Sequence, residues 1–307
     1  MVGRLNRLLL SAIAPSTRQS YSRAWNLFHD AMSTLEIPYN GVNSLPLSQH
    51  QILVFISYLL ARNYAPTSVI SYISALSYAH KMSGLFDPCS VFAVQKVLAA
   101  ATKISPSFDH RLPITLNILS NLSIGLNQTV SSPYIRILFR AMYLVSFFAL
   151  MRVGEVTTNK SGIVALRSEQ IRFYPTHVVL TISLFKHNVS GQPLQLYLTK
   201  QQDTSICPVT ALIEYFHLRG SRPGPLFCFP DLKPVPRQFF IKHLKINLSY
   251  CGLDTSLYQS HSFRIGGASF FASLGFSDEQ IRLLGRWKSN SFRIYIRGQR
   301  ILTAIQT

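Results

Sequence analysis

The sequence is poor in acidic residues and has no long apolar run, and each shortage excludes a class of protein. It contains 12 Asp and Glu against 30 Lys and Arg, which gives a formal net charge of +18. Such a charge is typical of proteins that bind nucleic acid or an anionic membrane surface. The longest apolar run lies between Arg140 and Arg152 and is too short to cross a bilayer. We therefore expect no membrane span, and we expect nucleic acid to be the partner.

Cysteine is also scarce. The four cysteines are Cys89, Cys207, Cys228 and Cys251, which are widely spaced and form no CxxC pair. This spacing argues against both a zinc site and a disulfide framework. We expect buried thiols in a reducing, intracellular compartment.

The first hundred residues carry four helical patterns, with apolar residues at spacings of three and four. Three of them begin with N-cap chemistry, at Ser16, at Ser48 and at the segment APTS (residues 65–68), and the fourth runs from Ser90 to about Ala101. In the first, we expect the side chain of Ser16 to cap the helix. Residues 1–103 are therefore predicted to form a small N-terminal domain of four helices.

A segment without periodicity, residues 104–113, contains prolines and is the predicted linker. The second predicted domain, residues 114–307, is mostly helical and includes a long apolar helix from about Tyr134 to Met151. Within it, HVVLTISLFKHNVSGQPLQLYL alternates with period two on both sides of HNVSG, which predicts a β-hairpin. The predicted fold class is mainly α, with a small antiparallel sheet in a mixed α/β second domain.

Both predicted domains carry excess positive charge. Residues 1–108 hold 8 basic and 3 acidic residues, and residues 109–307 hold 22 and 9. A two-lobed clamp around a duplex needs positive charge on both lobes, because each lobe must neutralise phosphates. The balance fits double-stranded DNA as the partner.

The closing segment, from His261 onward, reads HSFRIGGASFFASLGFSDEQIRLLGRWKSNSFRIYIR and holds polar residues that apolar packing does not need. A helix that begins here places His261 and Arg264 one turn apart on one face. Their side chains can therefore converge on one anion. Gly266 and Gly267 would let this helix approach a neighbouring backbone closely.

Five motifs occur in a fixed order along the chain: MRVGEV, LFKHN, HSFR, LGRW and IYIR. This ordered set resembles the tyrosine recombinases, also called phage-integrase-type recombinases. The segments STRQSYSRAW and YISALSYAHK resemble that family's core-binding domain, so the resemblance covers essentially the whole chain. The phrase LGRWKSNSFRIYIR is most similar to recombinases of eukaryotic mobile elements. The resemblance implies a site-specific DNA recombinase that is encoded by a mobile element, resides in the nucleus and works as a homotetramer on two DNA sites.

The resemblance also implies a reaction. The phenol of Tyr295 would attack a DNA phosphodiester and leave a 3′-phosphotyrosine link with a free 5′ hydroxyl. Arg152 and Arg264 would stabilise the charge on the non-bridging oxygens, because a planar guanidinium can hold two oxygens. His261 would be the base for the phenol proton.

Further roles follow from the same resemblance. Lys186 would protonate the departing 5′ oxygen, and Trp287 would donate its indole N–H to a phosphate oxygen. Glu155 would not contact the substrate but would hold the scaffold of the site in place. The cationic side chains would replace a divalent ion, so no metal and no cofactor are expected. Two features depart from the family pattern: Trp287 and Tyr295 are eight residues apart where many members have nine, and the stretch from Arg152 to Lys186 is long.

Each of these residues, taken alone, has a simpler explanation. Tyr295 is one of 14 tyrosines, His261 can merely begin a helix, and Trp287 can anchor a core. Arg152 can be a positive charge at a helix C-terminus, where the helix dipole favours it. Glu155 can be an ordinary capping or salt-bridge residue. A different class of function is a DNA-binding protein that keeps the fold but not the reaction. Type IB topoisomerases use similar chemistry, but the HSFR histidine and the helical N-terminal domain favour recombination.

Overall fold

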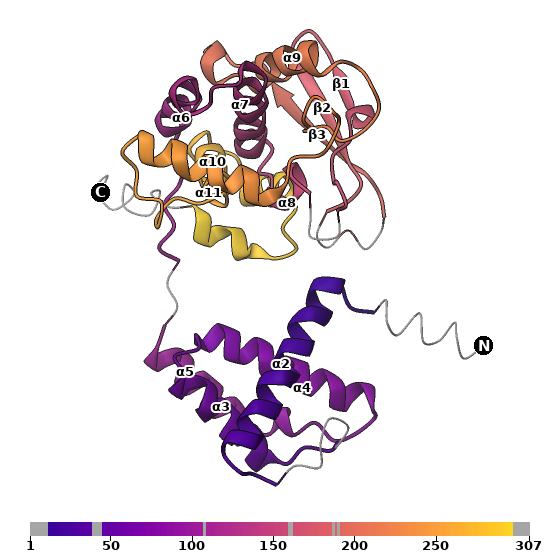
Figure 1. Cartoon of the computed structure of the whole chain (residues 1–307), viewed down its shortest axis with the longest axis vertical. Helices are drawn as coiled ribbons and strands as arrows, with labels where there is room; N and C mark the ends of the chain where they lie inside the picture. The colour runs from indigo at the N-terminus through magenta and orange to yellow at the C-terminus, as the bar shows by residue number, and fades with distance from the viewer. Residues whose placement is uncertain are drawn as a thin grey trace, which may run out of the picture. The chain divides into compact units, whose positions relative to one another are not determined.

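The computed structural model describes residues 12–38, 45–106, 109–158, 162–185, 188 and 191–296. The chain divides into two compact units, residues 1–109 and residues 110–307, whose elements are labelled in Figure 1. Within the described ranges, no helix combines the length and the hydrophobicity that a membrane crossing requires.

The described part of the first unit is entirely helical. Its elements are α2 (Pro15–Thr34), α3 (Gln49–Ala61), α4 (Pro66–Met82), the short 3₁₀ helix η1 (Pro88–Ser90) and α5 (Phe92–Ile104). Ser48 caps α3, and the side chain of Gln51 accepts from the Ser48 N–H at 2.9 Å. The predicted cap of the first helix is wrong, because α2 begins at Pro15 and its N-cap is Ala14 instead of Ser16. Proline is well suited to the first turn of a helix, where its missing N–H costs nothing.

The core of the first unit lies between its helices. Phe28 of α2 and Phe55 of α3 are fully buried and meet edge to face, with ring centroids 5.3 Å apart. His80 of α4 is also fully buried, and its Nε2 accepts from the backbone N–H of Leu47 at 2.9 Å. The ring therefore ties the segment before α3 to α4.

The second unit is helical around one small sheet. Its elements are α6 (Leu116–Thr129), α7 (Pro133–Phe148), α8 (Val153–Val156), η2 (Ser168–Gln170), β1 (Ile171–Phe173), β2 (His177–Ile182), β3 (Leu194–Thr199), η3 (Thr204–Ile206), α9 (Pro208–Arg219), α10 (Arg237–Tyr250), α11 (Ser262–Ser273), α12 (Asp278–Leu284) and η4 (Asn290–Tyr295). The described strands form an antiparallel sheet in the order β1-β2-β3. The predicted hairpin is confirmed, with His177 opposite Thr199 and Ile182 opposite Leu194.

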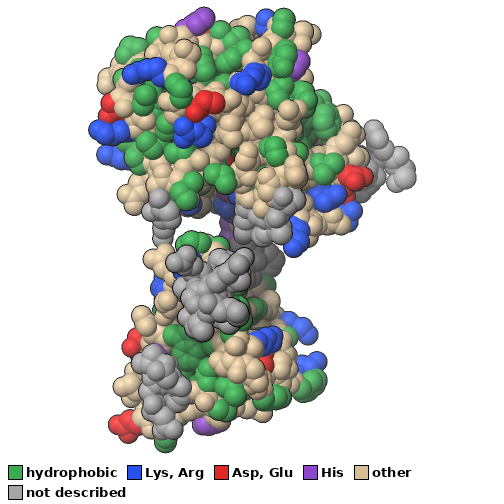
Figure 2. Space-filling model, turned by 90° about the vertical axis from the view of Figure 1, so that its right-hand side faces the viewer, with side chains coloured by type: hydrophobic (Ala, Val, Ile, Leu, Met, Phe, Trp, Pro, Cys, Tyr) green, Lys and Arg blue, Asp and Glu red, His purple; other side chains and the backbone are tan. Residues whose placement is uncertain are grey.

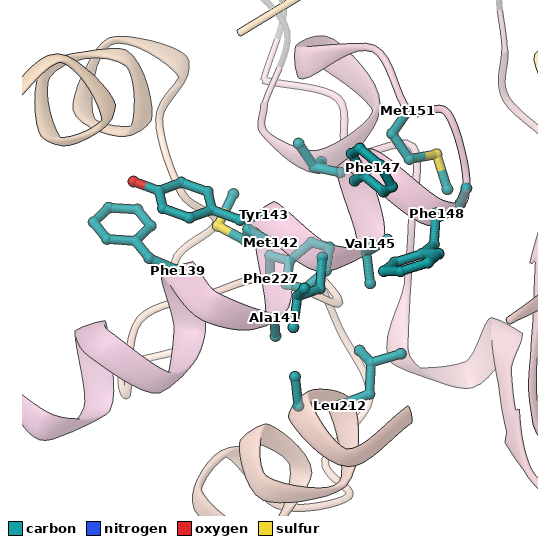
Figure 3. Close-up of a cluster of buried hydrophobic side chains, with 14 of the residues drawn as sticks. Phe139, Ala141, Met142, Tyr143, Val145, Phe147, Phe148, Met151, Leu212 and Phe227 are labelled. Atoms are coloured by element: carbon teal, nitrogen blue, oxygen red, sulfur yellow. The ribbon is translucent and has the colours of Figure 1, made fainter. Parts of the chain in front are cut away.

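Helix α7 is the centre of the second unit and packs against α6, α9 and α11. From Leu138 to Phe148 every residue except Arg140 is buried, so this part of the helix is enclosed on nearly every side. Figure 3 shows Phe139, Tyr143 and Phe147 along this helix and Leu212 of α9 nearby. The predicted long apolar helix is confirmed, although it ends three residues before Met151.

Helix α11 lies unusually close to its neighbours. A Cβ atom on Gly266 would stand 1.8 Å from the carbonyl oxygen of Ile114, and one on Gly267 would stand 2.3 Å from that of Phe147. Both distances are far below any van der Waals contact, so only glycine fits at these two positions. The predicted close approach is confirmed, and it fixes where the side chains at the start of α11 lie.

Candidate active site

Tyr295, at the end of η4, lies against two of the other predicted site residues. Its ring centroid is 5.0 Å from that of His261, edge to face, and 5.9 Å from that of Trp287. The hydroxyl of Ser269 on α11 donates to the backbone carbonyl of Tyr295 at 2.7 Å. The structure therefore brings together three side chains from the start of α11, the segment after α12 and η4.

Arg264 lies against the Trp287 ring of this group and is fully buried. Its guanidinium carbon is 3.9 Å from the centre of the Trp287 ring, and its two Nη atoms donate to the carbonyl oxygens of Leu150 and Gly285. Its Nε has no hydrogen-bond partner among the described residues. From the sequence we expect the guanidinium of Arg264 to be open to phosphate oxygens. In the structure, backbone carbonyls accept from both of its Nη atoms, because buried N–H groups need acceptors.

Arg152 and Glu155 form a pair at the start of α8. Arg152 Nη1 donates to Glu155 Oε1 at 3.0 Å, and the Arg152 backbone N–H donates to Oε2 at 2.9 Å. The side chain of Arg152 is 25% exposed, whereas that of Glu155 is 6% exposed. Arg152 is therefore the member of the pair that solvent can reach.

Arg286 belongs to the same cluster, although the sequence motifs did not single it out. Its Nη2 donates to Glu155 Oε2 at 2.8 Å and to the Leu150 carbonyl at 3.0 Å, and its side chain is 1% exposed. The sequence held one signal for it. Arg286 stands nine residues before Tyr295, the separation that many tyrosine recombinases have, whereas Trp287 stands eight before it.

Three guanidinium groups thus surround one carboxylate. Burial favours a raised pKa for Glu155, but the charge of Arg286, the backbone N–H of Arg152 and the charge of Arg152 together hold its pKa below the ordinary value. Burial lowers the pKa of Arg264, and repulsion from Arg152 and Arg286 adds to the effect. The cluster is therefore short of negative charge, which an anion such as a phosphate would supply.

The backbone is strained at two points of this cluster. Leu150 has φ +47° and Arg286 has φ +55°, both in the left-handed region that bulky residues seldom adopt. Each such residue costs on the order of 1–3 kcal/mol and persists only where its surroundings enforce it. The strained turn at Leu150 presents one carbonyl oxygen to both Arg264 and Arg286.

Lys186 lies outside the described residues, between β2 and β3 in the sequence, so its role as a general acid stays a prediction. The four cysteines are free thiols. Cys89, Cys207 and Cys228 are buried, as predicted, but the prediction is wrong for Cys251, which is partly exposed. In the parts of the chain that the structure describes, no group of three or more His, Cys, Asp or Glu side chains could hold a metal ion.

By sequence, the chain matches no family model and no curated protein. By structure, the chain is similar to lambda integrase in a tetramer bound to a Holliday junction. The match covers 94% of this chain and 76% of the integrase chain, with a TM-score of 0.61 at 15% identity. The XerH site-specific recombinase in a post-cleavage complex with palindromic difH covers 94% and 78%, with a TM-score of 0.66 at 15% identity. The Tn1549 transposon integrase in complex with transposon right-end DNA covers 96% and 93%, with a TM-score of 0.62 at 11% identity. This chain has the fold of the tyrosine recombinases.

The tyrosine-recombinase fold accounts for the mainly helical architecture and for the small antiparallel sheet. At identities of 11–15% the likeness extends to architecture alone. Within this fold, the chemistry of the present chain depends on its own cluster. In it, Trp287 contacts Tyr295 and Arg264, and Arg264 is linked to the Arg152–Glu155 pair through the Leu150 carbonyl and Arg286.

Proposed function

We propose that the protein is a site-specific DNA recombinase that cuts and rejoins DNA through Tyr295. The observation that carries the proposal is that Tyr295 meets His261 and Trp287, and that the Trp287 ring lies on the buried guanidinium of Arg264. These residues are far from Arg152 in the sequence, yet Arg152 is tied into the same network through Glu155. The net charge of +18 supports DNA as the substrate. Figure 2 shows Lys and Arg side chains at several places on the face that it presents.

In the proposed cleavage step the phenol oxygen of Tyr295 forms a bond to phosphorus, and the bond from phosphorus to the 5′ oxygen breaks. A neutral phenol is a weak nucleophile, so a base must accept its proton, and we assign this role to His261, whose ring lies against that of Tyr295. The 5′ oxygen leaves with a proton, which we assign to Lys186. Rejoining is the reverse, in which a 5′ hydroxyl attacks the phosphotyrosine and Tyr295 recovers its proton.

Charge builds on the non-bridging phosphate oxygens during this step. Arg152 exposes a quarter of its side chain and can donate to those oxygens directly. Arg264 contributes its fixed charge, and its Nε–H is a donor that no described residue uses. Preorganised donors of this kind stabilise the transition state because they need no reorientation as the charge develops.

The decisive experiment looks for a covalent adduct. The DNA on both sides of the gene is searched for paired repeats, and end-labelled DNA that carries such repeats is incubated with the protein. The products are separated under denaturing conditions. We expect a labelled protein band with the parent and with Tyr250→Phe, a control at an exposed tyrosine of the same unit. Tyr295→Phe should give no band. An adduct that persists in Tyr295→Phe would rule out Tyr295 as the nucleophile.

One observation favours a second candidate, a DNA-binding protein that does not cut. Arg264 is fully buried, and backbone carbonyls hold both of its Nη atoms. If this arrangement is permanent, the parent protein will bind the repeats but form no adduct. The same experiment, run beside a gel-shift titration, therefore separates the two candidates.

Three finer features belong to the proposal. We infer that the protein works as a homotetramer on two DNA sites, that residues 1–103 form a DNA-contacting core-binding domain, and that the gene is part of a eukaryotic mobile element whose product is nuclear. The tetramer bound to a Holliday junction in the lambda integrase structure supports the first of these. Mass photometry of the protein with its repeat DNA tests the tetramer, and the steep salt dependence of binding tests phosphate contacts.

A further inference from the structure

Glu155 divides its two oxygens between two arginines. Oε1 accepts from Arg152 Nη1 at 3.0 Å, while Oε2 accepts from Arg286 Nη2 at 2.8 Å and from the Arg152 backbone N–H at 2.9 Å. The guanidinium of Arg152 therefore holds only one carboxylate oxygen. Without Arg286, both oxygens would be available to Arg152, and bidentate pairing is the strongest arrangement of these two groups.

Arg286 is fixed in place in a way that Arg152 is not. Its Nη1 donates to the carbonyls of Ala149 and Leu284 at 3.1 and 3.0 Å, and its Nη2 also donates to the Leu150 carbonyl. These bonds join the residues after α7 to the end of α12. The side chain of Arg286 is 1% exposed and oxygen atoms hold both of its Nη atoms, whereas the side chain of Arg152 is 25% exposed.

We propose that Arg286 is a positioning residue that holds Oε2 of Glu155 and thereby leaves the exposed donors of Arg152 free to bind an incoming phosphate. The proposal rests on the proposed function only for the identity of that phosphate as part of DNA. The charges agree with it. Arg152, Arg264 and Arg286 face the single carboxylate of Glu155, so the cluster keeps positive charge in excess when Glu155 is ionised.

Trp287 makes the proposal measurable without DNA. Its ring lies 3.9 Å from the Arg264 guanidinium, and the sequence has only 2 tryptophans, the other being Trp25 in the first unit. In the full-length Trp25→Phe protein, all indole fluorescence reports on the cluster. Titration of this protein with inorganic phosphate gives the dissociation constant of the cluster for a phosphate anion.

In this background, Arg286→Met should weaken phosphate binding by roughly tenfold or more, the size of one hydrogen bond to a charged group. The double variant Arg286→Met with Glu155→Gln should recover most of that loss, because a neutral amide competes far less for Arg152. A purely structural role would not give this recovery, since the double variant lacks the same ion pair. Arg140→Met is the matched control, because it breaks the Arg140–Glu214 pair between α7 and α9 in the same unit and should leave the constant unchanged.

Circular dichroism establishes which variants are folded at the temperature of the titration. If Arg286→Met does not fold, Arg286→Lys serves in its place, because one ammonium group cannot bond Glu155 and three carbonyls together. It should also weaken binding, and Glu155→Gln should again restore it. Unchanged affinity in the folded Arg286 variant, no recovery in the double variant, or no phosphate binding by the parent would each overturn the proposal.

The outcomes for Arg286 and for recombination are separable. A phosphate titration that follows the expected pattern while the repeat DNA gives no adduct would uphold the role of Arg286 and reject the recombinase. An adduct that forms at the parent rate in Arg286→Met would uphold the recombinase and reject the role of Arg286.

Discussion

Two buried arginines of the second unit, Arg219 and Arg264, differ in how many of their donors are used. Arg219 makes five hydrogen bonds, which use all three of its nitrogens and end on the carbonyls of Gly220, Arg222, Pro225 and Leu226. Arg264 makes two such bonds, and its Nε has no hydrogen-bond partner among the described residues. Arg219 closes a loop, and its bonding capacity is used up there.

The neighbours of the two arginines differ as well. Arg264 lies under the Trp287 ring and close to Arg152 and Arg286. Burial lowers the pKa of Arg264, and the charges of these two arginines lower it further. Such a cation is stabilised when an anion arrives. Burial alone therefore says little about the role of an arginine, and the number of satisfied donors and the sign of the nearby charges say more.

The largest expected effect is on the rate of cleavage in Arg264→Lys. Removal of one well-placed donor from an oxyanion site typically costs about 100- to 1,000-fold in rate, and lysine lacks the planar guanidinium. Single-turnover adduct formation, measured where circular dichroism shows a folded protein, gives the rate. If the variant cuts within roughly tenfold of the parent, the contrast between Arg264 and Arg219 fails.

Arg219→Met should act on stability instead. It removes five hydrogen bonds and leaves the carbonyls of Gly220 and Pro225 without another donor among the described residues, whereas Ser168 and Tyr215 still donate to those of Arg222 and Leu226. At about 1–3 kcal/mol for each group left unsatisfied, the free energy of unfolding of the second unit should fall by about 3 kcal/mol. Urea denaturation measures this, and the adduct rate per folded molecule should not change. The control is Arg222→Met, an exposed arginine on the same loop, which should change the free energy by about 0.5 kcal/mol or less.

Gly266→Ala tests whether the packing of α11 sets the position of Arg264. The new Cβ would lie 1.8 Å from the Ile114 carbonyl, so α11 must move, at a cost of roughly 1–3 kcal/mol in the free energy of unfolding. We also expect slower adduct formation, because Arg264 moves with the helix. Gly154→Ala is the control, since its Cβ would meet nothing within 4 Å. Equal melting temperatures for the two variants would contradict the packing argument.

The smallest effect is expected at an exposed arginine. Arg293 in η4 donates to Asp278 at 2.7 Å, but the side chains are 55% and 49% exposed. Exposed pairs contribute about 0.2–1 kcal/mol, so Asp278→Asn should lower the free energy of unfolding by no more than that. A larger loss, seen in thermal melts at low and high salt, would mean that this pair holds the Tyr295 segment in place.

Much of the fold could be predicted because its signals are local. The hairpin follows from alternation along β2 and β3, and α7 follows from a run of apolar residues. The strand β1 was missed, because three residues are too few to show a period of two. The cap of α2 was misplaced because Pro15 competes with Ser16 for the first turn.

The site was harder to predict, because its parts meet only in the folded chain. The ordered motifs point to Tyr295, His261 and Trp287, and the structure places these three rings together, while their roles stay predictions. Arg286 lies within the motif LGRW, but the resemblance gave a role only to Trp287 of that motif. Its burial depends on a left-handed turn at its own position and on the end of α7, more than a hundred residues away in the sequence.

The shared acceptor of Arg264 and Arg286 is the main-chain carbonyl of Leu150. Because this oxygen belongs to the backbone, substitution of the leucine side chain does not remove it. What would remove it is a change in the turn itself, through an insertion or deletion next to α7. Evolution of this chain can therefore replace many side chains around the arginines freely, but it has little freedom to alter the length of the segment between α7 and α8.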